Sequence, residues 1–222
     1  MMSNIIYRDI ETGDIPSIKK AIANVWEWAE LIEDEDTLDA TLSIYLNQVL
    51  HEATFGRVAV LDGNVVGVIF GIAFGKEPVY RHLLADGFVL NFDMPNASER
   101  DKFAINTYFA KLDEAYDGLI DGIKDEYGGT LDFLVLNEDA QGLGIGKGLW
   151  LALKSYFDKN GVEAIYLYSD EDCNFGFYDH QGFKQRKRQP TLFDFGVYQF
   201  TSDQFLFEYR FATSKNSTDN EH

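Results

Sequence analysis

The sequence of 222 residues predicts a single α/β domain, with a mixed central β-sheet flanked by helices. A strand, a helix and a second strand follow one another within residues 130–170, and a connection of this length joins parallel strands by a right-handed crossover. The turn residues Asp62, Gly63 and Asn64 separate two apolar runs, which is typical of an antiparallel hairpin. No repeat or linker divides the chain, so we expect one domain over residues 1–211.

In the N-terminal half, the spacing of apolar residues predicts the elements in order. They are a strand at 5–10, a helix at 15–29 capped by Asp14, a helix at 37–53 behind the acidic residues 33–36, and the two hairpin strands within 57–75. Residues 76–97 are predicted to be irregular, with room for a short helix within 83–92.

A long amphipathic helix is predicted over residues 98–127, between the hairpin and the strand at 130–136, and Gly128 and Gly129 end it. The remaining elements are a helix at 148–157, a strand at 162–170, a short helix within 173–183, and two final strands near 184–189 and 204–211. The polar residues 212–222 are predicted to be a disordered tail.

Composition and charge exclude several classes of function. The net charge of −18 argues against nonspecific binding to nucleic acid or to an anionic membrane, because both need a basic surface. The single cysteine, Cys173, rules out an internal disulfide and fits a reducing compartment. There is no run of about 18 apolar residues and no start typical of a signal peptide, so the cytoplasm is the expected location.

The most informative stretch is EDAQGLGIGKGLW at residues 138–150, which lies between an apolar strand and a helix. Glycine costs about 1 kcal/mol per residue in a helix interior, whereas a glycine-rich turn at a helix start favours an anion such as a phosphate. The spacing excludes two phosphate motifs. Three residues separate Gly142 from Gly146 where the P-loop needs four, and the third glycine of a dinucleotide fingerprint would fall on Lys147 or Leu149. A glycine turn without any ligand is the alternative.

A third pattern fits the chain in two places. Residues Gln141 to Gly146 match Q/R-x-x-G-x-G/A, and Asn174-Phe175-Gly176-Phe177-Tyr178, followed by Gly182-Phe183, matches N…(F/L)-Y-x-x-x-G-F. In both segments, and in the order of elements over most of its length, the chain resembles the GNAT superfamily of acetyl-CoA-dependent N-acetyltransferases.

The resemblance implies how acetyl-CoA lies as the acyl donor. Its pantetheine arm would run beside Leu134, Val135 and Leu136, and a backbone N–H near Leu136 would stabilise the oxyanion. The pyrophosphate would meet the backbone N–H groups of the segment from Gly142 to Lys147. The cofactor-binding residues implied in this way are Leu134, Val135, Leu136, Gln141, Gly142, Leu143, Gly144, Ile145, Gly146, Lys147 and Asn174. Position 143 is often basic in the family, so Leu143 leaves Lys147 as the nearby cation.

Two catalytic residues are predicted. The resemblance assigns the general acid that protonates the departing thiolate to Tyr178, although a Phe-Tyr pair on a short helix can also be core. Asp132 is the candidate general base: alternation in the strand places its side chain on the face of Leu134 and Leu136, and burial would raise its pKa. The open alternatives are a solvent-facing Asp132, Asp170 or Glu171 as the base, a water chain, and a covalent role for Cys173.

The first two helices and their loop wall the acceptor site in the resembled family, and here Trp26, Trp28 and Glu30 become candidate substrate-binding residues. Aromatic rings with carboxylates suit a cationic amine, and a solvated helix end is the alternative. The predicted activity is acetyl transfer to a small or peptide amine. A protein that binds acyl-CoA without turnover is the second hypothesis, and a homodimer is a possible assembly.

Overall fold

The computed structural model describes residues 5–26, 28, 31–84, 94, 96–171, 173, 175–196 and 198–212, with the backbone alone for residues 26 and 139. Within these residues, a mixed seven-stranded sheet has the order β1-β2-β3-β4-β5-β7-β6. The β4–β5 pair is parallel and the other neighbours are antiparallel. The strands are β1 (Ile5–Arg8), β2 (Phe55–Leu61), β3 (Asn64–Ala73), β4 (Gly129–Leu136), β5 (Ala164–Asp170), β6 (Lys184–Asp194) and β7 (Gln199–Arg210). The predicted mixed α/β architecture is confirmed.

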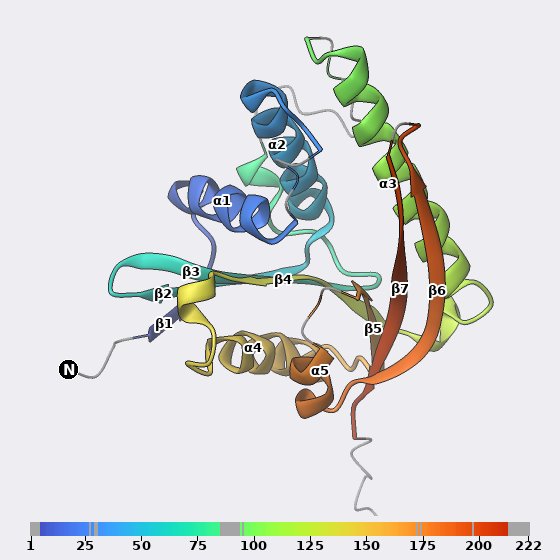
Figure 1. Cartoon of the computed structure of the whole chain (residues 1–222). Coiled ribbons are helices and arrows are strands. Elements are labelled where there is room, and N and C mark those ends of the chain that lie inside the picture. The colour runs from blue at the N-terminus through green and yellow to red at the C-terminus, as the bar shows by residue number, and fades with distance from the viewer. Residues whose placement is uncertain are drawn as a thin grey trace, which may run out of the picture.

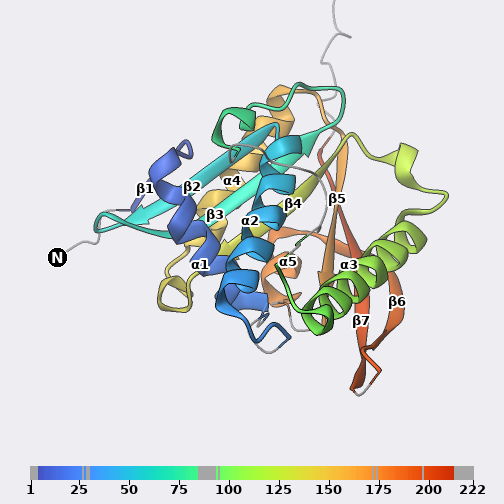
Figure 2. The same cartoon turned by 90° about the horizontal axis from the view of Figure 1, so that it is seen from above.

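Helices cover both faces of the sheet (Figure 1). Two helices, α1 and α2, pack with Val68, Phe70 and Phe133 on one face of the central strands. On the same side, α3 lies along the β5–β7–β6 part of the sheet (Figure 2), while α4 and α5 lie against the opposite face. The helices are α1 (Ile15–Trp26), α2 (Glu35–Glu52), α3 (Glu99–Ile120), α4 (Ile145–Lys159) and α5 (Phe175–Gln181).

Two helix boundaries differ from the prediction for identifiable reasons. Helix α2 begins at Glu35 because the side chain of Asp34 accepts a hydrogen bond from the N–H of Thr37 at 2.8 Å, so part of the acidic cluster forms its first turn. Helix α3 ends at Ile120 and not at Gly128, since Gly122 adopts a left-handed φ of 73° and turns the chain. Ile123 and Tyr127, which continued the apolar spacing, still pack beside Tyr166 and Leu206.

The last two strands are longer than predicted. They form a continuous antiparallel hairpin whose register runs from Lys184↔Glu208 to Asp194↔Gln199. The first of them was predicted to end near residue 189, just before Pro190, but β6 is the edge of the sheet, where a missing N–H is tolerated, and it continues to Asp194. The short helix expected within 83–92 and the tail at 212–222 lie largely outside the described residues.

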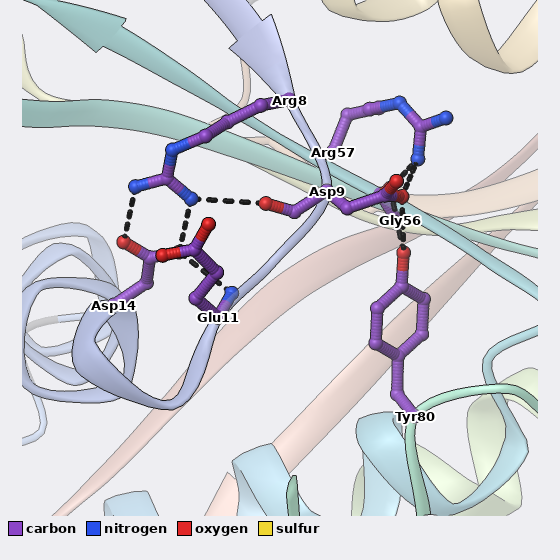
Figure 3. Close-up of polar contacts among 7 residues, drawn as sticks. All are labelled: Arg8, Asp9, Glu11, Asp14, Gly56, Arg57 and Tyr80. Atoms are coloured by element: carbon purple, nitrogen blue, oxygen red, sulfur yellow. Dashed lines mark hydrogen bonds and ion pairs between the residues drawn. The ribbon is translucent and has the colours of Figure 1, made fainter.

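A partly buried ion pair connects β1 to the start of α1 (Figure 3). Both guanidinium nitrogens of Arg8 donate to the carboxylate of Asp14, at 2.6 and 2.8 Å, and the N–H of Glu11 donates to it at 2.8 Å. Burial by itself would raise the pKa of Asp14, but these hydrogen bonds outweigh it and hold the pKa below its usual value.

We expect Arg8→Met to lower the free energy of unfolding by about 2 kcal/mol at neutral pH. The change leaves a buried carboxylate without its cation, which costs about 3–5 kcal/mol for a fully buried pair, and the partial exposure of Arg8 reduces that figure. Urea unfolding at several pH values measures it. The lowered pKa of Asp14 means that the stabilisation is present above its unfolded value near 4 and is lost as the pH falls, so the difference should narrow in acid.

Arg57→Met is the matched control, because Arg57 pairs with the exposed Asp9 in the same region (Figure 3). That change should cost less than about 1 kcal/mol. An equal loss in the two variants would contradict a special role for the Arg8–Asp14 pair.

Candidate active site

The sheet opens between its two parallel strands. Among the described residues, β4 and β5 pair only at Gly129↔Ile165 and Thr130↔Tyr166, near the start of each strand. On its other side, β4 stays paired with β3 as far as Leu136. The edge of β4 that faces β5 therefore has unpaired backbone groups beyond Thr130, and these groups need partners.

Asp132 is the extra residue of a β-bulge. The pairing of β3 with β4 passes from Phe70↔Phe133 directly to Gly71↔Leu131, so Asp132 has no residue opposite. The bulge reverses the alternation, and Asp132 does not share a face with Leu134 and Leu136, as strict alternation had predicted. Those two leucines pack on the α4 side, whereas Asp132 acts electrostatically on tyrosines of α2 and β5 on the opposite face.

A cleft of about 1620 Å³ runs along this opening. It is larger than a typical site for a single small molecule, about 300–1,000 Å³, and has room for two ligands. One end reaches Glu138, Gln141 and Gly142 after β4, and the other lies between α1, α3 and the β6–β7 hairpin. Predicted site residues that line the cleft are Asp132, Leu134, Val135, Leu136, Gln141, Gly142 and Tyr178.

The surroundings of Asp132 make it a weak acid. Its side chain is exposed to the cleft, and the protein that surrounds it removes part of its hydration. This desolvation, and secondarily the negative charge of Glu52, raises the pKa of Asp132 to about 7. A carboxyl group with a pKa near neutrality can take up a proton and release it at physiological pH.

The glycine segment forms a turn into α4. Gly142 and Gly144 have left-handed φ values of 75° and 77°, which other residues adopt only with strain. A Cβ atom at either position would meet no described atom within 4 Å, so this side of the turn is open. Gly148 donates to the carbonyl of Gly144 at 3.1 Å, and helix geometry leaves the preceding N–H groups without intrahelical acceptors. The turn thus offers backbone donors to an anion.

The next two glycines permit close packing. A Cβ at Gly146 would lie 3.0 Å from Leu136, and one at Gly148 would lie 2.1 Å from the hydroxyl of Tyr7 on β1. The other predicted residues of this segment take different places. Leu143 and Lys147 are exposed, and the side chain of Ile145 is buried in the core below the turn, so that residue can contribute only its backbone.

Tyr178 reaches the cleft from α5. Its ring packs against Phe183 and Phe207, with centroids 5.6 and 5.7 Å away. Burial, followed by the nearby Cys173 and Asp170, raises the pKa of the Tyr178 hydroxyl well above its usual value, so the group stays protonated. Burial and Asp170 also raise the pKa of the Cys173 thiol to about 11, which argues against the covalent alternative because the thiolate is the nucleophile.

Of the three residues predicted for acceptor binding, the structure describes the side chain of Trp28 alone. Trp28 is 3% exposed and packs edge-on against Tyr45 and Phe109, so it belongs to the core and not to the lining of the cleft. The side chain of Trp26 and the whole of Glu30 lie outside the described residues, as does Asn174. The alternative bases, Asp170 and Glu171, both line the cleft.

Sequence reasoning missed the contribution of the β6–β7 hairpin. Seven of its residues line the cleft, and they are Phe193, Phe195, Tyr198, Phe200, Thr201, Ser202 and Gln204. The aromatic residues on both sides of Gly196 are the sequence signal that could have revealed a hairpin here.

No group of three or more His, Cys, Asp or Glu side chains in the described part of the chain could hold a metal ion. None of the described helices is both long and apolar enough to cross a membrane.

Comparisons with known proteins agree with this geometry. The model of the Acetyltransferase (GNAT) family matches residues 21–183, so the chain belongs to this family of acetyltransferases and the predicted family is confirmed. None of the curated protein sequences matches the chain.

Several solved structures share the fold. PaiA N-acetyltransferase from Thermoplasma acidophilum, in complex with coenzyme A, is 16% identical with a TM-score of 0.51 over 94% of this chain and 99% of that one. The ribosomal-protein-alanine N-acetyltransferase from Brucella melitensis is 14% identical with a TM-score of 0.53, over 93% and 99%. YncA from Salmonella typhimurium, solved with acetyl-CoA, is 14% identical with a TM-score of 0.53, over 95% and 96%.

Proposed function

We propose that the protein transfers the acetyl group of acetyl-CoA to a primary amine by direct attack within the cleft. The observation that carries this proposal is the meeting of four features in or beside one cleft: the unpaired edge of β4, the glycine turn before α4, Asp132 and Tyr178. Membership of the acetyltransferase family supports the reaction class. The coenzyme A and acetyl-CoA present in two structures of the same fold support the donor.

The chain fits an acyl-CoA in two ways. The unpaired edge of β4 from Asp132 to Leu136 can pair with the amide groups of a pantetheine arm as an added strand would. The open turn at Gly142 and Gly144 presents backbone donors to a pyrophosphate, as a helix N-terminus commonly does. Lys147 is exposed at the same turn and adds one positive charge, whereas Leu143 adds none. The affinity for CoA would therefore depend mainly on backbone donors.

Asp132 and Tyr178 have complementary roles in the proposed transfer. Acetyl-CoA supplies a thioester, whose C–S bond breaks as the C–N bond to the amine forms. Asp132, as a carboxylate, accepts a proton from the ammonium form of the acceptor and so frees the lone pair that attacks, and the second proton leaves the nitrogen for solvent after the C–N bond has formed. Tyr178 donates its hydroxyl proton to the departing sulfur and recovers a proton from solvent. The pKa of about 7 for Asp132 and the raised pKa of Tyr178 give each group the protonation state that its role requires.

We expect kcat/KM to rise with pH through about 7, as Asp132 ionises, and Asp132→Asn to remove that inflection. The plateau rate should fall by about 10- to 100-fold, less than the full effect of a lost base, because Asp170 and Glu171 line the same cleft. Asp170→Asn is the comparison variant and should keep the inflection. An unchanged pH profile in Asp132→Asn would exclude Asp132 as the base.

Stability provides a second readout for Asp132. Its pKa is higher in the folded protein than in the unfolded chain, so the protonated group favours folding below pH 4 and this advantage is lost as the pH rises through about 7. Asp132→Asn keeps a neutral side chain at all pH values. Its melting temperature should therefore exceed that of the wild type at pH 8 and match it at low pH.

The activity is tested by incubating the protein with acetyl-CoA and a panel of primary amines while following the release of free CoA. Release that depends on the amine, with the acetylated amine found by mass spectrometry, supports the proposal. Tight binding of CoA without release for any amine would overturn it and favour the second hypothesis, a protein that binds acyl-CoA without turnover. Parallel calorimetric titration with CoA distinguishes this outcome from a failure to bind the donor.

A further inference from the structure

The end of the cleft away from the glycine turn has an unusually aromatic lining. We call the four aromatic residues of the β6–β7 hairpin the hairpin wall: Phe193, Phe195, Tyr198 and Phe200. Their rings contact one another, with centroids 4.9 Å apart for Phe193–Phe200 and 5.8 Å for Tyr198–Phe200. Tyr108 of α3 stacks on Phe193 at 5.4 Å and connects the wall to the helix.

Several apolar side chains in this part of the cleft are left open to solvent. Tyr198 is 58% exposed, Phe103 of α3 is 52% exposed and Val25 of α1 is 49% exposed, and all three line the cleft. Clustered apolar surface of this kind in a cleft is typical of a binding site. Its contact with water is unfavourable, and a ligand that covers it removes that cost. Three different elements therefore present apolar surface to the same occupant.

Gln204 of β7 adds a polar group to the cleft. The residue is 2% exposed and lines the cleft, and its Nε2 donates to the hydroxyl of Ser202 at 3.2 Å. Its Oε1 is buried and has no hydrogen-bond partner among the described residues. A buried carbonyl oxygen without a donor is unfavourable, and native proteins seldom leave one unless a ligand or water supplies the donor. Gln204 lies opposite Asp170 in the register, at the carboxyl end of β5.

The charges of the cleft indicate the sign of the occupant. Away from the glycine turn, three acidic side chains in the described lining, Asp132, Asp170 and Glu171, stand against one basic side chain, Arg100, and Arg100 is itself ion-paired with Glu33. The cleft therefore favours a cation and disfavours a carboxylate.

We propose that the acceptor is a primary amine attached to an aromatic or branched apolar body, with the hairpin wall and Phe103 covering the body and Oε1 of Gln204 accepting a hydrogen bond from the amine N–H. This inference rests on the proposed function and names its substrate class. A linear polyamine lacks an apolar body for the rings to cover, and a peptide would bring backbone polar groups that the wall does not match. Both are outcomes of the test.

The test compares four acceptors with acetyl-CoA: 2-phenylethylamine, ethylamine, 1,4-diaminobutane and a tetrapeptide with a free N-terminal alanine. We expect kcat/KM for 2-phenylethylamine to exceed that of each of the others by at least about tenfold, mainly through KM, since burial of an aromatic ring contributes to binding and not to the chemical step. Equal or better use of the diamine or the peptide would overturn the inference while leaving the proposed function intact.

Variants locate the effect on the wall. Tyr198→Ser should raise KM for 2-phenylethylamine about five- to tenfold, and should raise KM for ethylamine by much less, about twofold at most. Leu192→Ser is the matched control, because Leu192 is 50% exposed on the same hairpin and is not among the residues that line the cleft. Equal effects of the two changes would contradict the assignment.

Gln204→Leu tests the polar contact and separates it from a structural role. The change removes a buried, unpartnered oxygen at nearly constant volume, so the melting temperature should stay equal or rise, while the affinity for 2-phenylethylamine falls. A lower melting temperature with unchanged affinity would show that Gln204 is structural. Calorimetric titration of 2-phenylethylamine into the CoA-bound protein measures this affinity without turnover. If 2-phenylethylamine binds in a way that depends on Tyr198 in this titration, but no CoA is released in the assay with acetyl-CoA, the proposed function is overturned while the amine site stands.

Discussion

Gly144→Glu is expected to abolish the binding of CoA, with a loss of affinity of at least about 100-fold, or about 2.7 kcal/mol. The open side of the turn at Gly144 has no described atom within 4 Å of a Cβ, so the new side chain would occupy the space that we assign to the pyrophosphate. Its negative charge would also oppose the anion at the start of α4. Calorimetric titration with CoA measures the affinity, and thermal melting shows that the variant folds.

Gly63→Glu provides a matched control for this prediction. Gly63 lies in the hairpin turn between β2 and β3, has a left-handed φ of 87°, and likewise has open space around its Cβ position. The same substitution there adds the same charge and about 1 kcal/mol of backbone strain, away from the glycine turn. Gly63→Glu should bind CoA normally. A folded Gly144→Glu protein that binds CoA as tightly as the control would exclude this turn as the phosphate site.

The half of the cleft that we assign to the cofactor could be described from the sequence because the features proposed for it are local. The left-handed turn is specified by two glycines only two positions apart, Gly142 and Gly144. The helix that follows has regular apolar spacing. Tyr178 was predicted from a short motif on the same principle. In each case residues close together in the sequence form the feature, so the pattern can be recognised without tertiary contacts.

The half of the cleft that we assign to the acceptor depends on contacts between residues far apart in the sequence, which the sequence pattern does not contain. The bulge at Asp132 arises from the pairing of β4 with β3, and one extra residue moved this side chain to the other face of the sheet. The hairpin wall comes from residues beyond Pro190, past the predicted end of the strand near residue 189, and β6 tolerates this proline because it is the edge of the sheet. Trp28 looked like a binding residue because its burial among α2 and α3 cannot be seen from α1 alone.

Tyr178→Phe is expected to lower kcat by about 10²- to 10⁴-fold, the usual range for a lost general acid, and to leave CoA affinity nearly unchanged. The substitution keeps the ring that packs against Phe183 and Phe207 and removes only the hydroxyl that reaches the cleft. The raised pKa of this hydroxyl keeps it protonated across the neutral range, as a proton donor must be. Measurement at saturating substrates over a pH series separates the chemical step from binding.

Tyr209→Phe is the matched control for the hydroxyl. Tyr209 packs against Phe183 in the same cluster, at 5.3 Å between centroids, and is not among the residues that line the cleft. Its kcat should stay within about twofold of the wild type. If Tyr178 were only a packing residue, its variant would behave in the same way, with any loss appearing in the melting temperature or in CoA affinity. A thiolate leaves more readily than an amine, so the loss of kcat for Tyr178→Phe can fall at the lower end of the range. A kcat within about twofold of the wild type would remove Tyr178 from the mechanism.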